Sequence, residues 1–120
     1  MTFSLVARCA ETGMLGTAVS SSSPAVAARC SNTRAGVGAV SSQNITDPSL
    51  GPQTLNLIEG GLSATAAIKE IKNKATYLEY RQILAIDFCG ETAHHSGSNS
   101  LGIWGDAAGL NVLSAGNLLA

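Results

Sequence analysis

The sequence predicts an α+β fold in which antiparallel strands and a pair of helices form one domain over residues 1–120. Three observations support this: a strand–turn–strand pattern at residues 2–21, two segments with helical spacing at residues 47–74, and a β-prone run at residues 80–87. A chain of 120 residues with 45% hydrophobic residues is long enough to bury a core of its own.

The first predicted element is a β-hairpin. Residues 2–9 are β-prone, Glu11-Thr12-Gly13 supplies a turn, and residues 14–21 resume as a second strand. Counting outward from the turn, antiparallel partners should have numbers that sum to 24 or 25. This register places Thr2 opposite the serine run at residues 20–23.

Small residues dominate the next stretch. Residues 25–30 are apolar but too short to assign, and residues 31–33 are expected to form a turn. Residues 34–43 then predict a third strand, whose glycines indicate close approach of another backbone or layer. Gly36-Val37-Gly38 is not a dinucleotide-binding fingerprint, because Ser41 stands where the third glycine is required.

Two helices should follow and pack as a pair against a sheet. Asp47 is the expected N-cap of the first, with Pro48 at its first position and an end near Gly60. Ser63 is the expected N-cap of the second, which should run over residues 64–74.

The remainder predicts a return to strands. These are expected at residues 80–87, 92–96 and 112–115, with the turn between the first two at Cys89-Gly90. The expected order is therefore three strands, two helices, and then further strands.

The composition excludes several classes of protein. The chain has a net charge of −1 and no Lys/Arg cluster, which excludes a nucleic-acid interface. Charged residues make up only 12%, about half the ~25% of an average soluble domain. The low charge indicates that part of the surface is covered by a partner chain, by a second copy or by a missing remainder of the domain; the alternative is a surface rich in Ala, Gly and Ser.

Neither a membrane segment nor a metal site is expected. The chain shows no signal-peptide pattern and no run of ~18 apolar residues, so we expect a cytoplasmic protein that does not associate with membranes. Cys9, Cys30 and Cys89 lack metal-ligand spacing, and buried thiols are the default interpretation. His94 and His95 should face opposite sides of a strand. We expect no metal and no other cofactor.

Thr2 is the candidate nucleophile. Methionine aminopeptidases remove Met1 when the second residue is small, which would leave Thr2 with a free α-amine beside its hydroxyl. An α-amine has a pKa of about 7.7–8.0 and can take the hydroxyl proton at physiological pH. Thr is also a common second residue without any catalytic role, and the mechanism fails if Met1 stays attached.

Five other residues are candidates for the same site. Ser20, Ser21 and Ser22 should lie near Thr2 and contact a substrate, although a serine run is also typical of a plain loop. Arg34 is a candidate because a fixed cation near Thr2 would lower the amine pKa and stabilise an oxyanion; the alternative is a surface Arg. Asn117 is either an oxyanion donor or a turn residue.

A set of short motifs, all in order, resembles one prokaryotic family, the domain of unknown function 1028. The motifs span nearly the whole chain: Thr2–Arg8 with Glu11-Thr12-Gly13, Arg34–Val40 through Gln43, Asp47-Pro48, Gly51-Pro52, Gly61–Ala64, Tyr80-Arg81-Gln82 and Gly116–Leu119.

The resemblance implies an Ntn-hydrolase-like αββα sandwich. Thr2 would then be the N-terminal nucleophile of an amidohydrolase that cleaves a small amide or peptide bond. Arg34 stands near the place of a basic residue in proteasome-type enzymes, but those use Lys, and Arg can act only electrostatically. Many relatives also carry a Lys where this chain has Ser20–Ser23.

The resemblance also implies that this chain is the N-terminal half of the domain, since relatives are longer. The expected partner is the remaining half, as a second chain or through a homo-oligomer. Ntn enzymes often mature by autoprocessing, so a nucleophile at the start of the other chain competes with Thr2. The alternative from another class is a non-catalytic αββα binding or assembly subunit, or a structural half that completes a partner's sheet.

Overall fold

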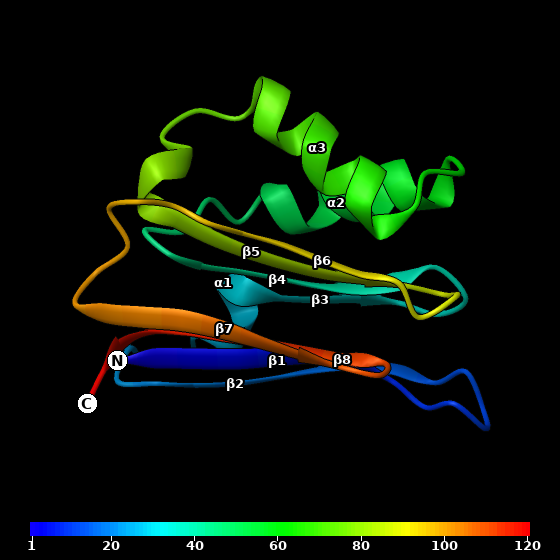
Figure 1. The fold of residues 1–120 in the computed structure, drawn as a ribbon, viewed down its shortest axis with the longest axis horizontal. Helices are drawn as coiled ribbons and strands as arrows, with labels where there is room; N and C mark the ends of the chain where they lie inside the picture. The colour runs from blue at the N-terminus through cyan, green and yellow to red at the C-terminus, as the bar shows by residue number, and fades with distance from the viewer.

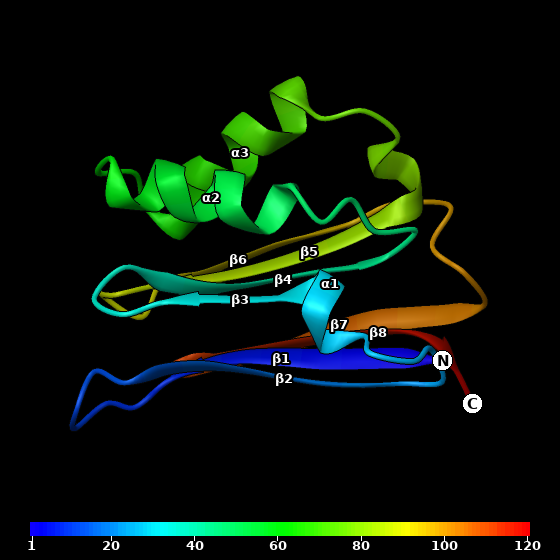
Figure 2. The same cartoon turned by 180° about the vertical axis from the view of Figure 1, so that it is seen from behind.

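The protein consists of two stacked antiparallel sheets with two helices on one outer face (Figure 1 and, from behind, Figure 2). The computed structural model describes residues 1–120. One sheet, here the terminal sheet, has the strand order β2-β1-β8-β7; the other, the middle sheet, has the order β3-β4-β5-β6. The strands are β1 (Thr2–Arg8), β2 (Leu15–Ser21), β3 (Ser31–Arg34), β4 (Gly38–Asn44), β5 (Arg81–Asp87), β6 (Thr92–Ser96), β7 (Ile103–Gly109) and β8 (Val112–Leu119). The helices are α1 (Ala27–Cys30), α2 (Leu50–Glu59), α3 (Ala64–Lys74) and a 3-10 turn η1 (Leu78–Tyr80).

The middle sheet is buried on both faces, which explains the apolar run of β5. Alternate residues of a strand face opposite sides. Val40 and Ile83 pack with Leu50, Ile68 and other side chains beneath α2 and α3. Every residue of β5 is buried, as expected for a central strand covered on both sides.

The space between the two sheets, here the inter-sheet layer, is apolar at one end and polar at the other. Val6, Leu84, Ile86 and Leu113 form the apolar part together with Ala39 and Ala115. Toward the ends of β1 and β8 that carry Thr2 and Asn117, the inward residues become hydroxyls and amides. The polar half of this layer is where the candidate site lies.

The helix α3 begins as the sequence predicted, whereas α2 begins at Leu50 with Ser49 at the N-cap position, two residues later than the expected start at Pro48. The Ser63 hydroxyl accepts from Ala66 N at 3.2 Å and caps α3. The Asp47 carboxylate accepts from Ser49 N at 2.9 Å, just before the first residue of α2. Asp47 therefore acts as a cap although the regular helix begins only at Leu50, and Pro52 is tolerated because its missing N–H lies in the first turn.

The turn between β5 and β6 supports the start of α3. Asp87 is 6% exposed and accepts from Ala64 N at 2.9 Å and from Cys89 N and Glu91 N at 3.0 Å. Glu91 accepts from Thr65 N at 3.2 Å. Two carboxylates thus satisfy N–H groups of the first helical turn, where the helix dipole favours negative charge.

We expect Glu91→Gln to lower the stability of the protein at neutral pH but not in acid. The Thr65 N–H, and then the Ser63 and Thr65 hydroxyls, hold the pKa of Glu91 below its usual range. Its contribution is therefore complete above the unfolded pKa of about 4.3 and is lost as the pH falls through the folded pKa. Urea unfolding at about pH 7 and about pH 2 measures this; an equal loss at both pH values would contradict it.

The structure corrects two sequence expectations and adds two elements that were not predicted. The stretch expected as one strand over residues 34–43 is a hairpin, because Gly36 adopts φ 71° and turns the chain between β3 and β4. Residues 31–33, expected as a turn, belong to β3. The edge strand β7 was not predicted, and the unassigned segment before Cys30 contains α1.

The cysteines also differ from expectation. Cys9 and Cys89 are exposed, and only Cys30 is a buried thiol, whose pKa is raised by its burial. All three are free.

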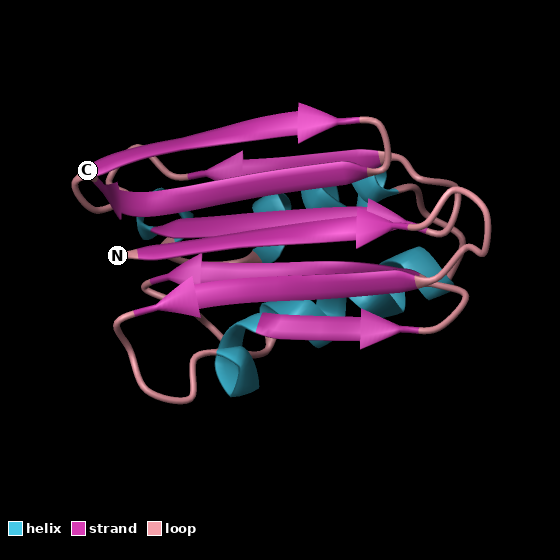
Figure 3. Ribbon diagram, turned by 90° about the horizontal axis from the view of Figure 1, so that it is seen from below, coloured by secondary structure: helices cyan, strands magenta, loops and turns pink.

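The outer face of the terminal sheet has no helix over it. Figure 3 looks onto this face and shows α2 and α3 behind the strands. Phe3 and Leu5 point outward from β1 and are 48% and 38% exposed. With Ala18, Ala107 and Leu119 among its lining residues, they border a shallow groove of about 500 Å³. This bare, mostly apolar face contrasts with the covered middle sheet.

The helices themselves are short. The longest, α3, has 11 residues, and none is long and apolar enough to cross a membrane.

Candidate functional site

Thr2 is the first residue of β1 and faces the inter-sheet layer. It shares this face with Ser4 and Val6, which are 2% and 0% exposed. The Thr2 hydroxyl lies 2.8 Å from the hydroxyl of Ser21 on β2. A potential nucleophile therefore stands at the end of the layer, in contact with a second hydroxyl.

The serine run lies where it was predicted, with a different register. Thr2 pairs with Ser21, so partner numbers sum to 23, below the expected 24 or 25. Ser20 pairs with Phe3 and faces the outer side of the sheet, away from Thr2. The Ser22 hydroxyl lies 3.4 Å from the Met1 nitrogen. Of the three predicted serines, Ser21 alone makes a side-chain hydrogen bond to Thr2.

Asn117 lies on the other side of Thr2, within β8 and not in a turn. The two residues are directly opposite each other in the antiparallel pair, so their Cβ atoms are about 5 Å apart. Asn117 is 3% exposed and faces the inter-sheet layer. The next residue, Leu118, adopts φ 50°, a conformation that costs a non-Gly residue about 1–3 kcal/mol and that clusters at functional sites.

Two buried glutamines of the middle sheet form a hydrogen-bond network that includes Asn117. The Asn117 amide donates to Gln82 Oε1 at 3.0 Å, and Gln43 Nε2 donates to the same oxygen at 3.1 Å. Gln82 Nε2 in turn donates to the carbonyl oxygen of Gly116 at 3.1 Å. These amides connect the two sheets at the end where Thr2 lies.

Arg34 does not belong to this site. It lies beside the β3–β4 turn, which borders the β1–β2 turn at the far end of β1. A seven-residue strand separates that end from Thr2 by about 20 Å. Arg34 forms an ion pair with Glu59 at 2.7 Å and donates to Asn56 at 3.0 Å. The predicted proximity failed because the expected single strand is a hairpin that returns the chain.

Met1 precedes Thr2 in the sequence. Its carbonyl oxygen accepts from Ser22 N at 3.2 Å and so extends the β1–β2 ladder by one residue. In this form the nitrogen of Thr2 is an amide and cannot act as a base. Removal of Met1 would leave the Thr2 amine beside the serine run.

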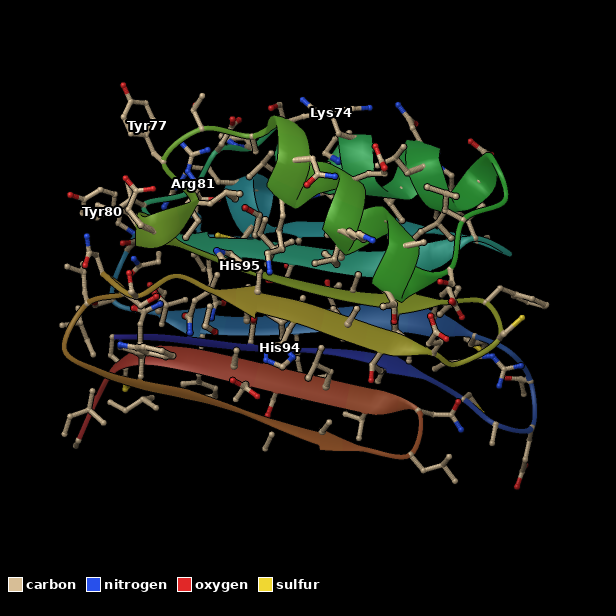
Figure 4. The ribbon with its side chains drawn as sticks, turned by 45° about the horizontal axis from the view of Figure 1, so that its top comes forward. Lys74, Tyr77, Tyr80, Arg81, His94 and His95 are labelled. Atoms are coloured by element: carbon tan, nitrogen blue, oxygen red, sulfur yellow. The ribbon has the colours of Figure 1, made fainter.

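The two histidines point to opposite sides, as the strand pattern predicted (Figure 4). His94 reaches from β6 toward β7, with its Nε2 3.2 Å from an Asp106 carboxylate oxygen. His95 points toward the helix layer, where its Nε2 lies 2.8 Å from the Leu78 carbonyl oxygen. The two histidines therefore make separate contacts, which link β6 to β7 through His94 and β6 to η1 through His95.

Sequence reasoning missed Gln82 and Gln43 as parts of this site. A usable signal was present, since each is a large amide directly next to a run of apolar or small residues, residues 83–86 for Gln82 and residues 38–42 for Gln43. Both are 0% exposed, and a buried amide needs partners. The strained Leu118 has no such signal in the sequence.

The fold and site together define a class: an α+β protein of two stacked antiparallel sheets, with a hydroxyl and amide cluster at the end of the inter-sheet layer. The chain belongs to the family of unknown function DUF1028, whose model matches residues 2–120.

A solved structure is similar over almost the whole chain. Protein SPO2555 from Silicibacter pomeroyi, which carries the same family assignment, superposes with a TM-score of 0.94 at 27% identity. The match covers 98% of this chain and 53% of that one, so this chain spans about half the length of that protein. No curated protein matches the chain.

Proposed function

We propose that this chain carries the nucleophile of an Ntn-type amidohydrolase that cleaves a small amide or peptide bond. The observation that supports the proposal is the position of Thr2, which begins β1 between the Ser21 hydroxyl at 2.8 Å and the amide of Asn117 on the adjacent strand. A hydroxyl, a potential amine base and an amide donor are the groups that acyl transfer requires.

In the proposed mechanism the reaction begins after Met1 is removed. The neutral amine of Thr2 takes the hydroxyl proton, directly or through one water, while Oγ1 attacks the substrate carbonyl carbon. The negative charge that develops on the carbonyl oxygen is stabilised by Asn117 and by backbone N–H groups. The C–N bond breaks as the leaving amine receives the proton, and water then hydrolyses the Thr2 ester to release the acid and restore Thr2.

Ser21 has a supporting role in this scheme. Its hydroxyl accepts from Ser23 N at 3.1 Å and lies within hydrogen-bond distance of Thr2 Oγ1. This contact fixes the rotamer of the nucleophile. Arg34 is not part of the mechanism, because it lies at the opposite end of β1.

We also propose that the complete protein is an αββα sandwich, in which a second helical layer covers the terminal sheet. The bare groove of about 500 Å³ beside Phe3 and Leu5 supports this. So does the length of SPO2555, of which this chain matches only 53%. The proposed occupant is the remaining half of the domain, joined to this chain or supplied as a second one.

The first test is the intact mass of every polypeptide in the native preparation, followed by activity against a panel of small amides and dipeptides. We expect a chain that has lost one Met, together with the remainder of the domain, and hydrolysis by that preparation. The matched control is the same protein made with methionine aminopeptidase inhibited, which differs by Met1 alone and should be inactive. Equal hydrolysis by both forms would refute Thr2 as the nucleophile.

The alternative function is a non-catalytic binding or assembly subunit. This function needs no free amine at Thr2, so it does not depend on removal of Met1. A native preparation that retains Met1 in every molecule would support this alternative over the enzyme.

A further inference from the structure

We propose that Gln82 is a positioning residue that aims the side-chain amide of Asn117 at the substrate carbonyl oxygen. This inference rests on the proposed function and extends it to a residue on the other sheet. Gln82 lies on β5 in the middle sheet, whereas Thr2 and Asn117 lie on adjacent strands of the terminal sheet. It would act only through Asn117, without touching the substrate.

Gln82 uses its whole hydrogen-bonding capacity. Its Oε1 accepts from Asn117 Nδ2 and Gln43 Nε2, at 3.0 and 3.1 Å. Its Nε2 donates to the Gly116 carbonyl oxygen at 3.1 Å and to the Ser96 hydroxyl at 3.2 Å. A side-chain amide offers two acceptor lone pairs and two N–H donors, so no position is left open.

This bonding pattern determines which way each amide points. If Gln82 were flipped, its NH₂ group would face the NH₂ groups of Asn117 and Gln43, and its oxygen would face the Gly116 carbonyl. Gln43 cannot flip either, because its Nε2 also donates to the Ala115 carbonyl oxygen at 3.1 Å. The Asn117 side chain must therefore present its NH₂ end to Gln82.

The orientation matters because Asn117 has two N–H bonds and Gln82 takes only one of them. The second N–H is the group that can donate to the carbonyl oxygen of a substrate that Thr2 attacks. Without Gln82 the amide could rotate and present its oxygen instead, which would repel a developing oxyanion. A donor that is oriented before the reaction contributes most to catalysis, since no reorganisation is needed.

This buried polar network lowers the stability of the fold, so stability alone does not explain it. Gln82 and Gln43 are 0% exposed and Asn117 is 3% exposed. Gln43 Oε1 and the Ser4 and Ser41 hydroxyls of the same layer have no hydrogen-bond partner. Burying polar groups without full compensation destabilises a fold, so apolar side chains of similar size would serve stability better. What the two glutamine amides add is a fixed orientation of the Asn117 side-chain NH₂ group.

The test is a double-mutant cycle between Gln82→Met and Asn117→Ala, measured as kcat and KM on an amide that the wild-type protein hydrolyses. We expect Asn117→Ala to lower kcat about 100-fold or more. Gln82→Met should lower kcat about 10- to 100-fold, less than the loss of the donor itself, with KM changed less than threefold. The double variant should be no slower than Asn117→Ala alone, because Gln82 acts through that residue.

Leu84→Val is the matched control. Leu84 is 0% exposed and lies two residues further along the same face of β5, so this variant loosens the same layer without touching an amide. Its melting temperature should fall while its kcat stays within threefold of wild type. A comparable fall in kcat would show that Gln82 matters only for packing and would overturn the proposal.

Two further measurements test the proposal even if Gln82→Met fails to fold. They are the kcat of Gln82→Glu and the NMR signals of the Asn117 side-chain amide. Glu keeps the oxygen that accepts from Asn117, so Gln82→Glu should retain more kcat than Gln82→Met. In wild-type protein, the Asn117 NH₂ proton that is donated to Gln82 should exchange with solvent much more slowly than that of an exposed side-chain amide. Exchange of both Asn117 protons as fast as in an exposed amide would overturn the positioning role without any variant.

The outcomes separate the two proposals. No wild-type activity, or full activity in Asn117→Ala, would refute the proposed chemistry, and the catalytic role of Gln82 with it. Two results would overturn the positioning role alone and leave the proposed function standing. In the first, Asn117→Ala lowers kcat but Gln82→Met does not. In the second, the fall in kcat of the double variant equals the product of the two single falls.

Discussion

An alanine at position 2 is expected to remove amide hydrolysis almost completely. Thr2→Ala deletes the hydroxyl that would attack the substrate and leaves the strand, its register and the amine in place. We expect kcat to fall by at least about 1,000-fold, equivalent to about 4 kcal/mol of transition-state stabilisation. The measurement is kcat on the amide that the Met1-free protein hydrolyses fastest, with the N-terminus of each variant verified by mass.

Two variants provide controls for this result. Thr2→Ser keeps a hydroxyl on a residue that still permits removal of Met1, and should retain measurable turnover. Ser21→Ala removes the hydroxyl 2.8 Å from Thr2 Oγ1 and should cause a smaller loss, about 10-fold, because it supports the nucleophile without reacting. Wild-type rates in Thr2→Ala would locate the nucleophile elsewhere.

The largest effect on stability is expected from Asp87→Ala. This carboxylate is 6% exposed and accepts three backbone N–H groups at 2.9 to 3.0 Å, one of them from the first turn of α3. Removing it leaves those donors without partners at a buried turn. We expect a loss of about 3 kcal/mol, since a hydrogen bond to a charged group contributes about 1.5–3 kcal/mol and water replaces some of them. Urea unfolding followed by circular dichroism measures it.

Asp106→Asn is the appropriate comparison for Asp87→Ala. Asp106 also has a partner, His94 at 3.2 Å, but the two side chains are 31% and 40% exposed. Exposed ion pairs contribute about 0–1 kcal/mol, so this variant should unfold close to wild type. A loss below about 1 kcal/mol in Asp87→Ala would mean that the turn is held by the strands alone.

Local patterns were sufficient to predict the elements that local interactions specify. The β1–β2 hairpin follows from its turn at Gly13, and α3 follows from the Ser63 cap and the apolar spacing behind it. The strand β5 was evident because residues 83–86, in the middle of this buried central strand, form an apolar run. In each case, residues close together in the sequence are enough to predict the element.

The missed elements lack such a signal. The strand β7 is almost entirely exposed and consists largely of Gly and Ala, so it shows neither alternation nor β-propensity. The β3–β4 hairpin was interpreted as one strand because its glycines suggested only close packing. Gly38 does have that role, since a Cβ there would meet the Ile86 carbonyl oxygen at 2.6 Å, but Gly36 forms the turn.

The site was predictable only in part for the same reason. The proximity of Thr2 to the serine run depends on a short hairpin, and the sequence indicated it. The position of Asn117 beside Thr2 depends on pairing between β1 and β8, which no local pattern encodes. Arg34 was placed wrongly because one unrecognised turn reverses the direction of the chain, and Gln82 reaches the site from the other sheet.

The pairing of the first strand with the last also determines when the site can exist during synthesis. Residue 2 leaves the ribosome long before residue 117, and β1 has only β2 as a neighbour until β8 is complete. Contacts between residues so distant in sequence form late and slow folding. The proposed nucleophile Thr2 therefore stays without its proposed amide donor on the nascent chain. Under that proposal, hydrolysis would begin only when residues 2–117 have been made and have folded.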